Sequence, residues 1–259
     1  MHAPHSLRVA ASLGPAPTLR RARDLGLDVM TPAGTDALRS FGRRRGRALS
    51  ARQADLWRDL LPRVAVAANA AQLAHPERLF PANVREVWLE IGFGGGEHLL
   101  WQAEQHPDAG MLGCEPFQAG VVKVLAAISA RAEDNIRLYA DDARLLLRHM
   151  PAACIGRAFV LFPDPWPKRR HWKRRLLSEG TLAELARVMR PGAELRIATD
   201  VAEYAQWILL AVRRQGGFHW IAVAASDWRA RGGDWPQTRY EAKALRDGRR
   251  CSYFRFRRG

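Results

Sequence analysis

The residues best placed to do chemistry begin with an acid and a cluster of glycines after an apolar segment. In the stretch VWLEIGFGGGEHLL, Glu90 stands two residues before Gly92, and Gly94 follows. Glycines in such a turn let the backbone approach a nucleotide-like ligand at the start of a helix. The dinucleotide fingerprint needs a glycine three residues after Gly94, but Glu97 stands there, which disfavours NAD. A carboxylate at Glu90 would repel phosphates and favours a cationic ligand.

Further acids follow the next two apolar segments. Glu115 comes roughly 20 residues after the glycines, where doubly wound folds place an acid that accepts hydrogen bonds from ribose hydroxyls. Asp142 ends the third segment, and the adjacent Asp141 is a competing choice. Any one of these acids could instead cap a helix. Acids at successive strand ends nevertheless favour a ligand site, because ligands of open α/β sheets bind beyond those carboxyl ends.

A basic, proline-rich segment follows the fourth apolar run. Residues 163–175 read PDPWPKRRHWKRR, and Asp164 is their only acid. A lone acid among cations would weaken phosphate attraction. Two interpretations of Asp164 remain: it contacts a base, or it orders the arginines of the loop.

Strand-length apolar runs alternate with helix-length amphipathic stretches from residue 84 onward, which predicts an α/β fold with a mostly parallel sheet covered by helices on both faces. Strands are expected at residues 86–91, 111–114, 136–140, 157–162 and 194–198, and helices from near residues 97, 118, 142, 178 and 201. Residues 218–225 and 251–257 have no long helix between them and are expected to complete a seven-stranded sheet as an antiparallel pair.

Three parts of the chain are expected. Residues 1–37 are proline-bearing and aperiodic, which predicts a flexible tail. Residues 38–83 form a basic helical or linker extension, in which Arg39 to Arg47 read RSFGRRRGR and suit a phosphate backbone, with a solvated linker as the alternative. Residues 84–259 form the catalytic domain.

Composition narrows the partners and the compartment. The net charge of +15 favours a polyanion such as nucleic acid, although an arginine excess can also reflect a GC-rich genome. The apolar runs are far shorter than the ~18 residues of a membrane span, so no membrane partner is expected. The three cysteines lack metal-ligand spacing, so no metal site is predicted. The first residues lack a secretory apolar core, which predicts a cytoplasmic protein.

The acid followed by GxGxG resembles the first motif of Rossmann-like class I methyltransferases, whose cofactor, S-adenosyl-L-methionine, carries an ammonium and a sulfonium. Together with RSF near residue 40, ATD at residues 198–200 and TRYE at residues 238–241, the segment from Pro163 to Arg175 resembles the bacterial tRNA (guanine-N7)-methyltransferase family. The matching motifs occur in the expected order and span residues 39–256.

The resemblance implies methyl transfer to N7 of a guanosine in the variable loop of tRNA, at position 46, by an enzyme that is a monomer or a homodimer and needs no metal. It implies that Asp142 contacts the adenine amino group and that Asp164 is catalytic. The cofactor residues would be Glu90, Gly92, Gly94, Glu115 and Asp142, and the substrate residues Lys168, Asp200, Thr238, Arg239, Tyr240 and Glu241. From sequence alone, Asp200 would be an ordinary helix cap, and Tyr240 replaces the more frequent Phe.

Two other functions compete. Methyltransferases of exocyclic amines place an Asp or Asn, two prolines and an aromatic residue at the same strand end, but their prolines are adjacent, whereas Asp164 separates Pro163 from Pro165. A noncatalytic RNA-binding protein with a vestigial cofactor fold would be expected to have lost Glu90, the glycines or Asp164, and all are present.

Overall fold

A computed structural model describes residues 40–131 and 134–259, and these residues belong to one compact unit. The predicted tail at residues 1–37 and Arg39 lie outside the described residues. The described chain contains no helix that combines the length and the apolar character needed to cross a membrane.

Short helices precede the sheet. Ser50 begins the first helix through a capping box with Gln53, in which each side chain bonds to the backbone of the other residue. A π-helical turn then continues into an α-helical turn with a proline in its first turn. The helices of this part are α1 (Ala51–Asp55), η2 (Leu56–Leu60), α2 (Leu61–Val64), α3 (Ala70–Leu73) and η3 (Pro76–Leu79).

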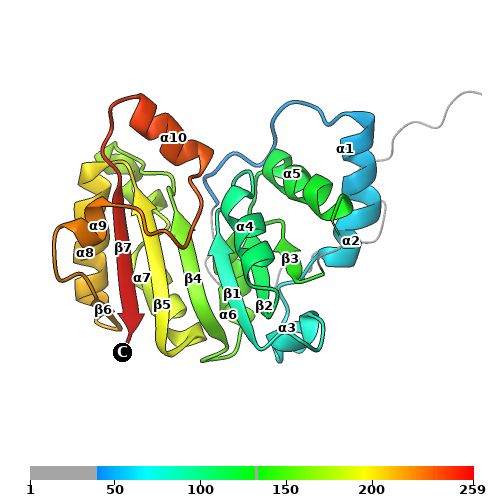
Figure 1. Cartoon of the computed structure of the whole chain (residues 1–259), viewed down its shortest axis with the longest axis horizontal. Helices are drawn as coiled ribbons and strands as arrows, with labels where there is room; N and C mark the ends of the chain where they lie inside the picture. Colours follow the sequence, from blue (N-terminus) through cyan, green and yellow to red (C-terminus); the bar gives the residue numbers. More distant parts are fainter. Residues whose placement is uncertain (1–39, 132–133) are drawn as a thin grey trace, which may run out of the picture. The chain divides into compact units, whose positions relative to one another are not determined.

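The seven-stranded sheet has the order β3-β2-β1-β4-β5-β7-β6, from right to left in Figure 1. Neighbouring strands from β3 to β5 pair in parallel, and β7 pairs antiparallel with both β5 and β6. The prediction of a mostly parallel sheet finished by an antiparallel pair is confirmed. The strands are β1 (Glu86–Ile91), β2 (Ala109–Cys114), β3 (Ile136–Tyr139), β4 (Ile155–Leu161), β5 (Met189–Thr199), β6 (Phe218–Trp220) and β7 (Ser252–Arg258).

Alternation along β1 shows how helices cover both faces. Val87, Leu89 and Ile91 pack in one core cluster with side chains of α6, α7 and α8, whereas Trp88 packs in a second cluster with side chains of α4 and α5. The helices from α4 onward are α4 (Glu97–Gln105), α5 (Gln118–Ser129), α6 (Ala143–His149), η4 (Arg169–Arg174), α7 (Glu179–Val188), α8 (Ala202–Gln215), α9 (Ser226–Arg229) and α10 (Arg239–Arg246).

The strand predicted at residues 218–225 is wrong in extent, because β6 ends at Trp220. One further bond to the sheet follows, from the Ile221 amide to the Arg255 carbonyl. The amides of Val223 and Ala224 then donate to the Asp227 carboxylate at 2.8 Å, which turns the chain into α9. These two amides therefore bond to a nearby side chain and not, as the apolar sequence had suggested, to a neighbouring strand.

Candidate active site

A cavity of about 480 Å³ lies where the parallel strands β1, β2, β3 and β4 end. Parallel strands present their carboxyl ends at one edge of the sheet, so the residues after each strand meet there. Its lining includes Gly92, Gly94, Glu115, Asp141, Asp142 and Asp164, joined by Tyr240 from α10 and by residues 40–43 from the N-terminal side. Three acid-bearing strand ends thus share one cavity with the predicted glycine turn.

The glycine turn joins β1 to α4 as predicted. Gly94 has φ +57°, a conformation that favours glycine, and its amide donates to Glu115 Oε2 at 2.8 Å. The turn also lies against the first turn of α5, because a Cβ built on Gly120 would be 2.2 Å from the Gly94 carbonyl oxygen. The backbone of the turn is therefore held closely between Glu115 and Gly120.

Glu115 is a buried acid whose two oxygens are both positioned. Oε1 accepts from the Phe117 amide at 2.8 Å, and Oε2 accepts from the Gly94 amide. Burial raises the pKa of Glu115, and the negative charges of Asp164 and Glu90 raise it further, although the two amide bonds act against the rise. A cationic ligand in this cavity would relieve that accumulation of negative charge.

Asp142 and Asp141 both line the cavity, so both remain candidates for the adenine contact. Asp142 caps α6 by accepting from the Arg144 amide at 3.0 Å, and it pairs with the Arg144 guanidinium at 2.6 Å. Burial would raise the pKa of Asp142, but the bonds and charge of Arg144 outweigh it and hold that pKa below the ordinary value. Asp141 pairs with Arg44 and accepts from the Asp142 amide.

The Asp164 loop combines an unpaired acid with a strained backbone. Asp164 is exposed, lines the cavity and forms no hydrogen bond or ion pair with another described residue. Phe162 and Trp166, two residues to either side, have φ values of +51° and +42°, which non-glycine residues rarely adopt. The interpretation that Asp164 orders the arginines of the loop therefore finds no support among the described contacts.

Arg175 orders this loop instead. Its Nε donates to the Pro165 carbonyl at 2.9 Å, and its side chain is buried among the rings of Trp172, Tyr204 and Trp207. The other end of the guanidinium pairs with Glu203 at 2.7 Å. A buried arginine, bonded through Nε and Nη2, is thus fixed to the residue that follows Asp164.

Glu90 does not line the cavity. It is on the α4 side of the sheet, only 2% exposed, and its Oε2 is 2.7 Å from His98 Nδ1. It is nevertheless near Glu115, because its charge contributes to the raised pKa of Glu115. The cationic ligand expected beside Glu90 would have to share this carboxylate with His98, a partner that the sequence pattern did not indicate.

In the TRYE segment, Thr238 and Glu241 are buried, whereas Arg239 and Tyr240 are more exposed. Thr238 caps α10 by accepting from the Glu241 amide at 3.2 Å, and the buried Glu241 carboxylate accepts from the Tyr253 hydroxyl at 2.6 Å and from Arg231 at 3.0 Å. Arg239 pairs with Glu97 at 3.2 Å. The half-exposed Tyr240 is left to line the cavity.

Asp200 and Lys168, like Thr238, Arg239 and Glu241, lie outside the cavity lining. Asp200 follows β5 and pairs with Arg249, while Val201 occupies the N-cap of α8, so the simpler interpretation of Asp200 as a cap is wrong. Lys168 is exposed and precedes the basic turn η4.

Sequence reasoning missed the cavity-lining role of residues 40–43. Phe41, which was assigned to phosphate binding, stacks with Arg174, and Arg174 also lies over Trp166. Nothing local in the sequence indicated that Phe41 contacts Arg174, because the two residues are more than a hundred positions apart.

The described residues suit an organic cation better than a metal. None of their His, Cys, Asp and Glu side chains form a group of three that could hold a metal ion. The cavity volume is within the range of about 300–1,000 Å³ typical of small-molecule sites. Positioned carboxylates beside a glycine turn are the hydrogen-bond acceptors that a nucleoside bearing positive groups requires, so S-adenosylmethionine fits this site.

Comparisons with known proteins show what the chain is similar to. A family described as putative methyltransferase matches residues 84–253. A tRNA (guanine-N(7)-)-methyltransferase of Nitrobacter hamburgensis is 48% identical over 218 residues, which are 84% of this chain and 86% of the relative. A protein of the same name from Chelativorans sp. is 46% identical over 216 residues, covering 83% and 93% of the two chains. The 16S rRNA methyltransferase KamB aligns at 18% identity with a TM-score of 0.49, over 69% of this chain and 90% of that protein.

Proposed function

Because the chain belongs to the tRNA (guanine-N7)-methyltransferase family, we propose that it transfers a methyl group from S-adenosyl-L-methionine to N7 of a guanosine in tRNA, at position 46 of the variable loop. The single observation that carries the proposal is the Asp164 carboxylate, which has no partner among the described residues and lies in the same cavity as the glycine turn and Glu115. A tRNA substrate would place the enzyme in the cytoplasm.

The site can hold the donor by charge and shape. Bound S-adenosylmethionine would supply an electrophilic methyl group carried on a sulfonium. Glu115 would accept hydrogen bonds from the ribose, Asp142 or Asp141 would contact the adenine amino group, and Gly92 and Gly94 would let the backbone approach. Each of these residues lines the cavity, which supports the assignment of the cofactor to this space.

Asp164 is suited to orient the guanine. N7 of guanine presents an in-plane lone pair, so no general base is needed to prepare it for methylation. A carboxylate that accepts from the N1 hydrogen and the amino group would hold the base in line, and its attraction would increase as the purine becomes cationic. The Arg175 bond to Pro165 would hold the strained backbone between Phe162 and Trp166 and so keep Asp164 in place before the substrate arrives.

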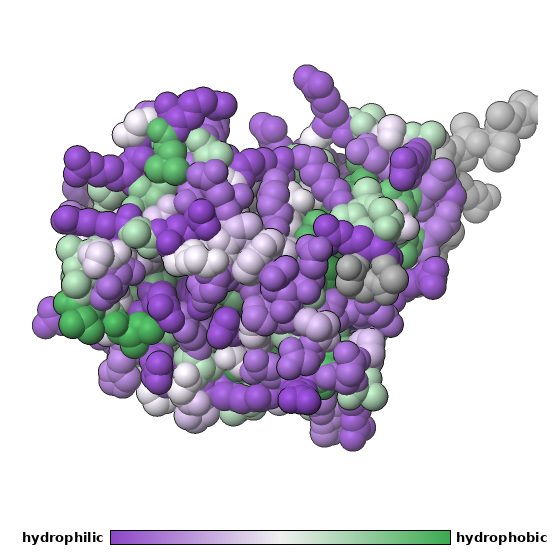
Figure 2. All heavy atoms as spheres, in the orientation of Figure 1, coloured by the Kyte–Doolittle hydropathy of each residue, from purple (hydrophilic) through white to green (hydrophobic). Residues whose placement is uncertain are grey.

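Cations around the site favour an RNA substrate. Arg169, Arg170 and Lys173 are exposed on the segment that follows Asp164. A shallow cavity beside Gly94 is lined by Lys123, Arg239 and Lys243, and Tyr240 borders both this cavity and the acid-lined one. Figure 2 shows a mostly hydrophilic surface on the face it presents. The cofactor space is lined by arginines as well as by the acids, and the exposed cations lie where a phosphate backbone could approach.

The substitution Asp164→Asn tests the assignment. It keeps the shape of the side chain but removes the charge that favours a cationic purine. We expect turnover on total tRNA to fall by about 100-fold or more, while the dissociation constant for S-adenosylmethionine changes less than about threefold. Equal losses of turnover and of cofactor affinity would contradict the role given to Asp164.

Nucleoside analysis of tRNA methylated by the native protein identifies the product. Label in 7-methylguanosine supports the proposal. Label in a methylated exocyclic amine of adenine or cytosine would replace it with the competing enzyme class. Tight binding of tRNA without calorimetric binding of S-adenosylmethionine would indicate a noncatalytic RNA-binding protein.

A further inference from the structure

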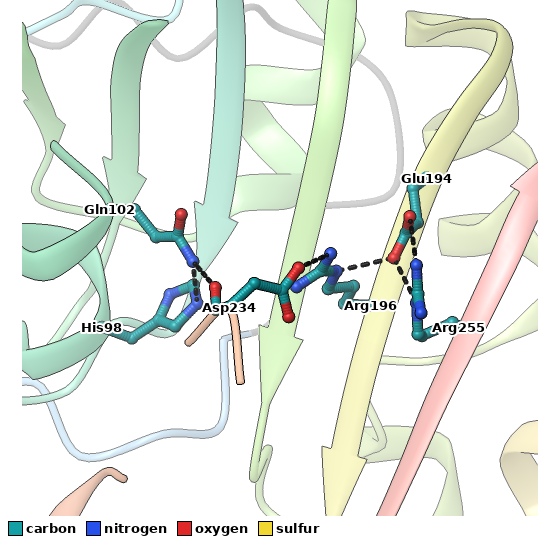
Figure 3. A network of polar contacts seen from close by, with 6 residues as sticks. All are labelled: His98, Gln102, Glu194, Arg196, Asp234 and Arg255. Atoms are coloured by element: carbon teal, nitrogen blue, oxygen red, sulfur yellow. Dashed lines mark hydrogen bonds and ion pairs between the residues drawn. The ribbon is translucent and has the colours of Figure 1, made fainter. Parts of the chain in front are cut away.

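A buried chain of hydrogen bonds leads from Glu90 to the C-terminal part of the protein. His98 and Gln102 lie one helical turn apart on α4, and both are almost completely buried. His98 Nδ1 is 2.7 Å from Glu90 Oε2, and His98 Nε2 is 3.1 Å from Gln102 Nε2. Gln102 Nε2 in turn donates to the main-chain carbonyl of Asp234 at 3.1 Å, as Figure 3 shows.

The Asp234 carbonyl determines the direction of every bond in this chain. A carbonyl oxygen can only accept, so the Gln102 amide must direct its NH₂ group toward it. The same nitrogen has a second hydrogen, which it donates to His98 Nε2. Because Nε2 then accepts, the ring proton lies on Nδ1 and is donated to Glu90. Gln102 Oε1 is left without a partner among the described residues, but the opposite amide orientation would place two acceptors together.

Packing fixes the imidazole ring in this orientation. Phe159 of β4 meets the ring edge-on at a centroid distance of 4.6 Å, and Trp235 meets it at 5.9 Å. A buried ring packed against two aromatic side chains cannot turn to exchange its nitrogens without displacing them. The tautomer and the orientation of His98 are therefore both determined by groups outside the cofactor cavity.

Asp234 is itself anchored to the last strands of the sheet. Its carboxylate pairs with Arg196 of β5 at 2.5 Å, Arg196 pairs with Glu194 at 2.6 Å, and Glu194 pairs with Arg255 of β7 at 2.7 Å (Figure 3). The anchored residue lies only a few positions before α10, which carries Tyr240 into the cavity. The chain of bonds thus joins the strand that leads into the glycine turn to the segment that contributes Tyr240.

We propose that His98 is a positioning residue for Glu90, and that Gln102 and the Asp234 carbonyl select the tautomer that makes it one. The inference rests on the proposed function, because it assigns the free oxygen of Glu90 to the positive methyl donor. His98 occupies Oε2, while Oε1 forms no hydrogen bond with a described residue. Glu90 is outside the cavity lining but directly precedes Ile91 and Gly92, which line it, so the donor would reach Oε1 from that side. A carboxylate held at one oxygen keeps its other oxygen directed at a fixed point, which lowers the entropy lost on binding.

The test compares two replacements of His98 that differ in one donor. His98→Leu removes the donor to Glu90, whereas His98→Asn retains an amide N–H near the position of Nδ1. We expect the dissociation constant for S-adenosylmethionine, measured by calorimetry, to rise roughly 10- to 100-fold in His98→Leu, as for loss of a hydrogen bond to a charged group. His98→Asn should recover most of this loss, and the KM for tRNA should change less than about threefold in both variants.

A spectroscopic measurement covers the case in which His98→Leu fails to fold. Long-range ¹H–¹⁵N correlation of the native protein, with the signal assigned through Gln102→Met, should show His98 protonated on Nδ1 and not on Nε2. Protonation on Nε2 would overturn the proposal, as would unchanged cofactor affinity in His98→Leu or equal loss of affinity in both His98 variants. Failure of the native protein to bind S-adenosylmethionine would instead refute the proposed function.

Discussion

Arg175→Met perturbs the Asp164 loop without touching the cavity. The arginine is 2% exposed, and its guanidinium carbon is 4.8–5.1 Å from the ring centroids of Trp172, Tyr204 and Trp207. Methionine retains the apolar stem but cannot donate to the Pro165 carbonyl. The substitution therefore removes the Arg175–Pro165 hydrogen bond, which acts as a clamp on the loop. It leaves most of the space between the three rings filled.

The cost can be worked from these contacts. A Pro165 carbonyl without its donor costs about 1–3 kcal/mol, and lost cation–π attraction costs about 0.5–2 kcal/mol. The Glu203 pair adds less than ~1 kcal/mol, because its carboxylate is 48% exposed. Relief from burying the guanidinium offsets part of the sum. We expect a net loss of about 2–4 kcal/mol in the free energy of unfolding, or roughly 5–15 °C in melting temperature.

The functional effect should be larger than the effect on cofactor binding. Without the clamp, the strained backbone at Phe162 and Trp166 can relax and move Asp164, so kcat at a temperature well below melting should fall about 10- to 100-fold. Calorimetric affinity for S-adenosylmethionine should change less than about threefold. Urea denaturation and single-turnover methylation of tRNA measure the two quantities.

Glu203→Gln is the matched control, because it removes the exposed half of the ion pair and leaves the Pro165 bond intact. It should cost less than ~1 kcal/mol and leave kcat unchanged. If Glu203→Gln destabilised the protein as much as Arg175→Met, the ion pair and not the clamp would carry the stability. Native kcat in folded Arg175→Met would refute the positioning of Asp164 by this loop.

Two further changes test the cofactor cavity. A cationic donor prefers ionised Glu115, whose pKa lies above its usual 4.5, so affinity for S-adenosylmethionine should be full above that raised pKa and fall as pH drops through it. Calorimetry at successively lower pH, starting from neutral, should show this fall, and Glu115→Gln should bind more weakly and lose it. Parallel profiles would contradict the role of Glu115. Gly120→Ala brings a Cβ within 2.2 Å of the Gly94 carbonyl oxygen, which is backbone and cannot yield cheaply, so cofactor affinity should fall about tenfold. Gly180→Ala on α7, where a Cβ meets open space, is the control, and equal affinity in the two variants would show that the turn is not held by α5.

The local sequence was enough to predict where the strands end and which acids follow them. The bounds of β1 and the starts of α4 and α5 match the prediction, because strand-length apolar runs are followed there by amphipathic stretches of helical period. Once the strands are parallel, the residues after each of them must meet at one edge. Glu115, Asp142 and Asp164 therefore share a cavity for a reason that can be read along the chain.

Tertiary structure decided which of the predicted side chains face the cavity and which residues bind the others. Glu241 was grouped with Tyr240 by motif, yet the carboxylate turns to Tyr253 and Arg231 while Tyr240 faces the cavity. Glu90 binds His98, whose tautomer depends on a carbonyl 132 residues beyond Gln102. The sequence specifies the period of a strand or helix, since that depends on neighbours along the chain. The partner of a buried polar group depends on which distant segment packs against it, and only the folded core supplies that segment.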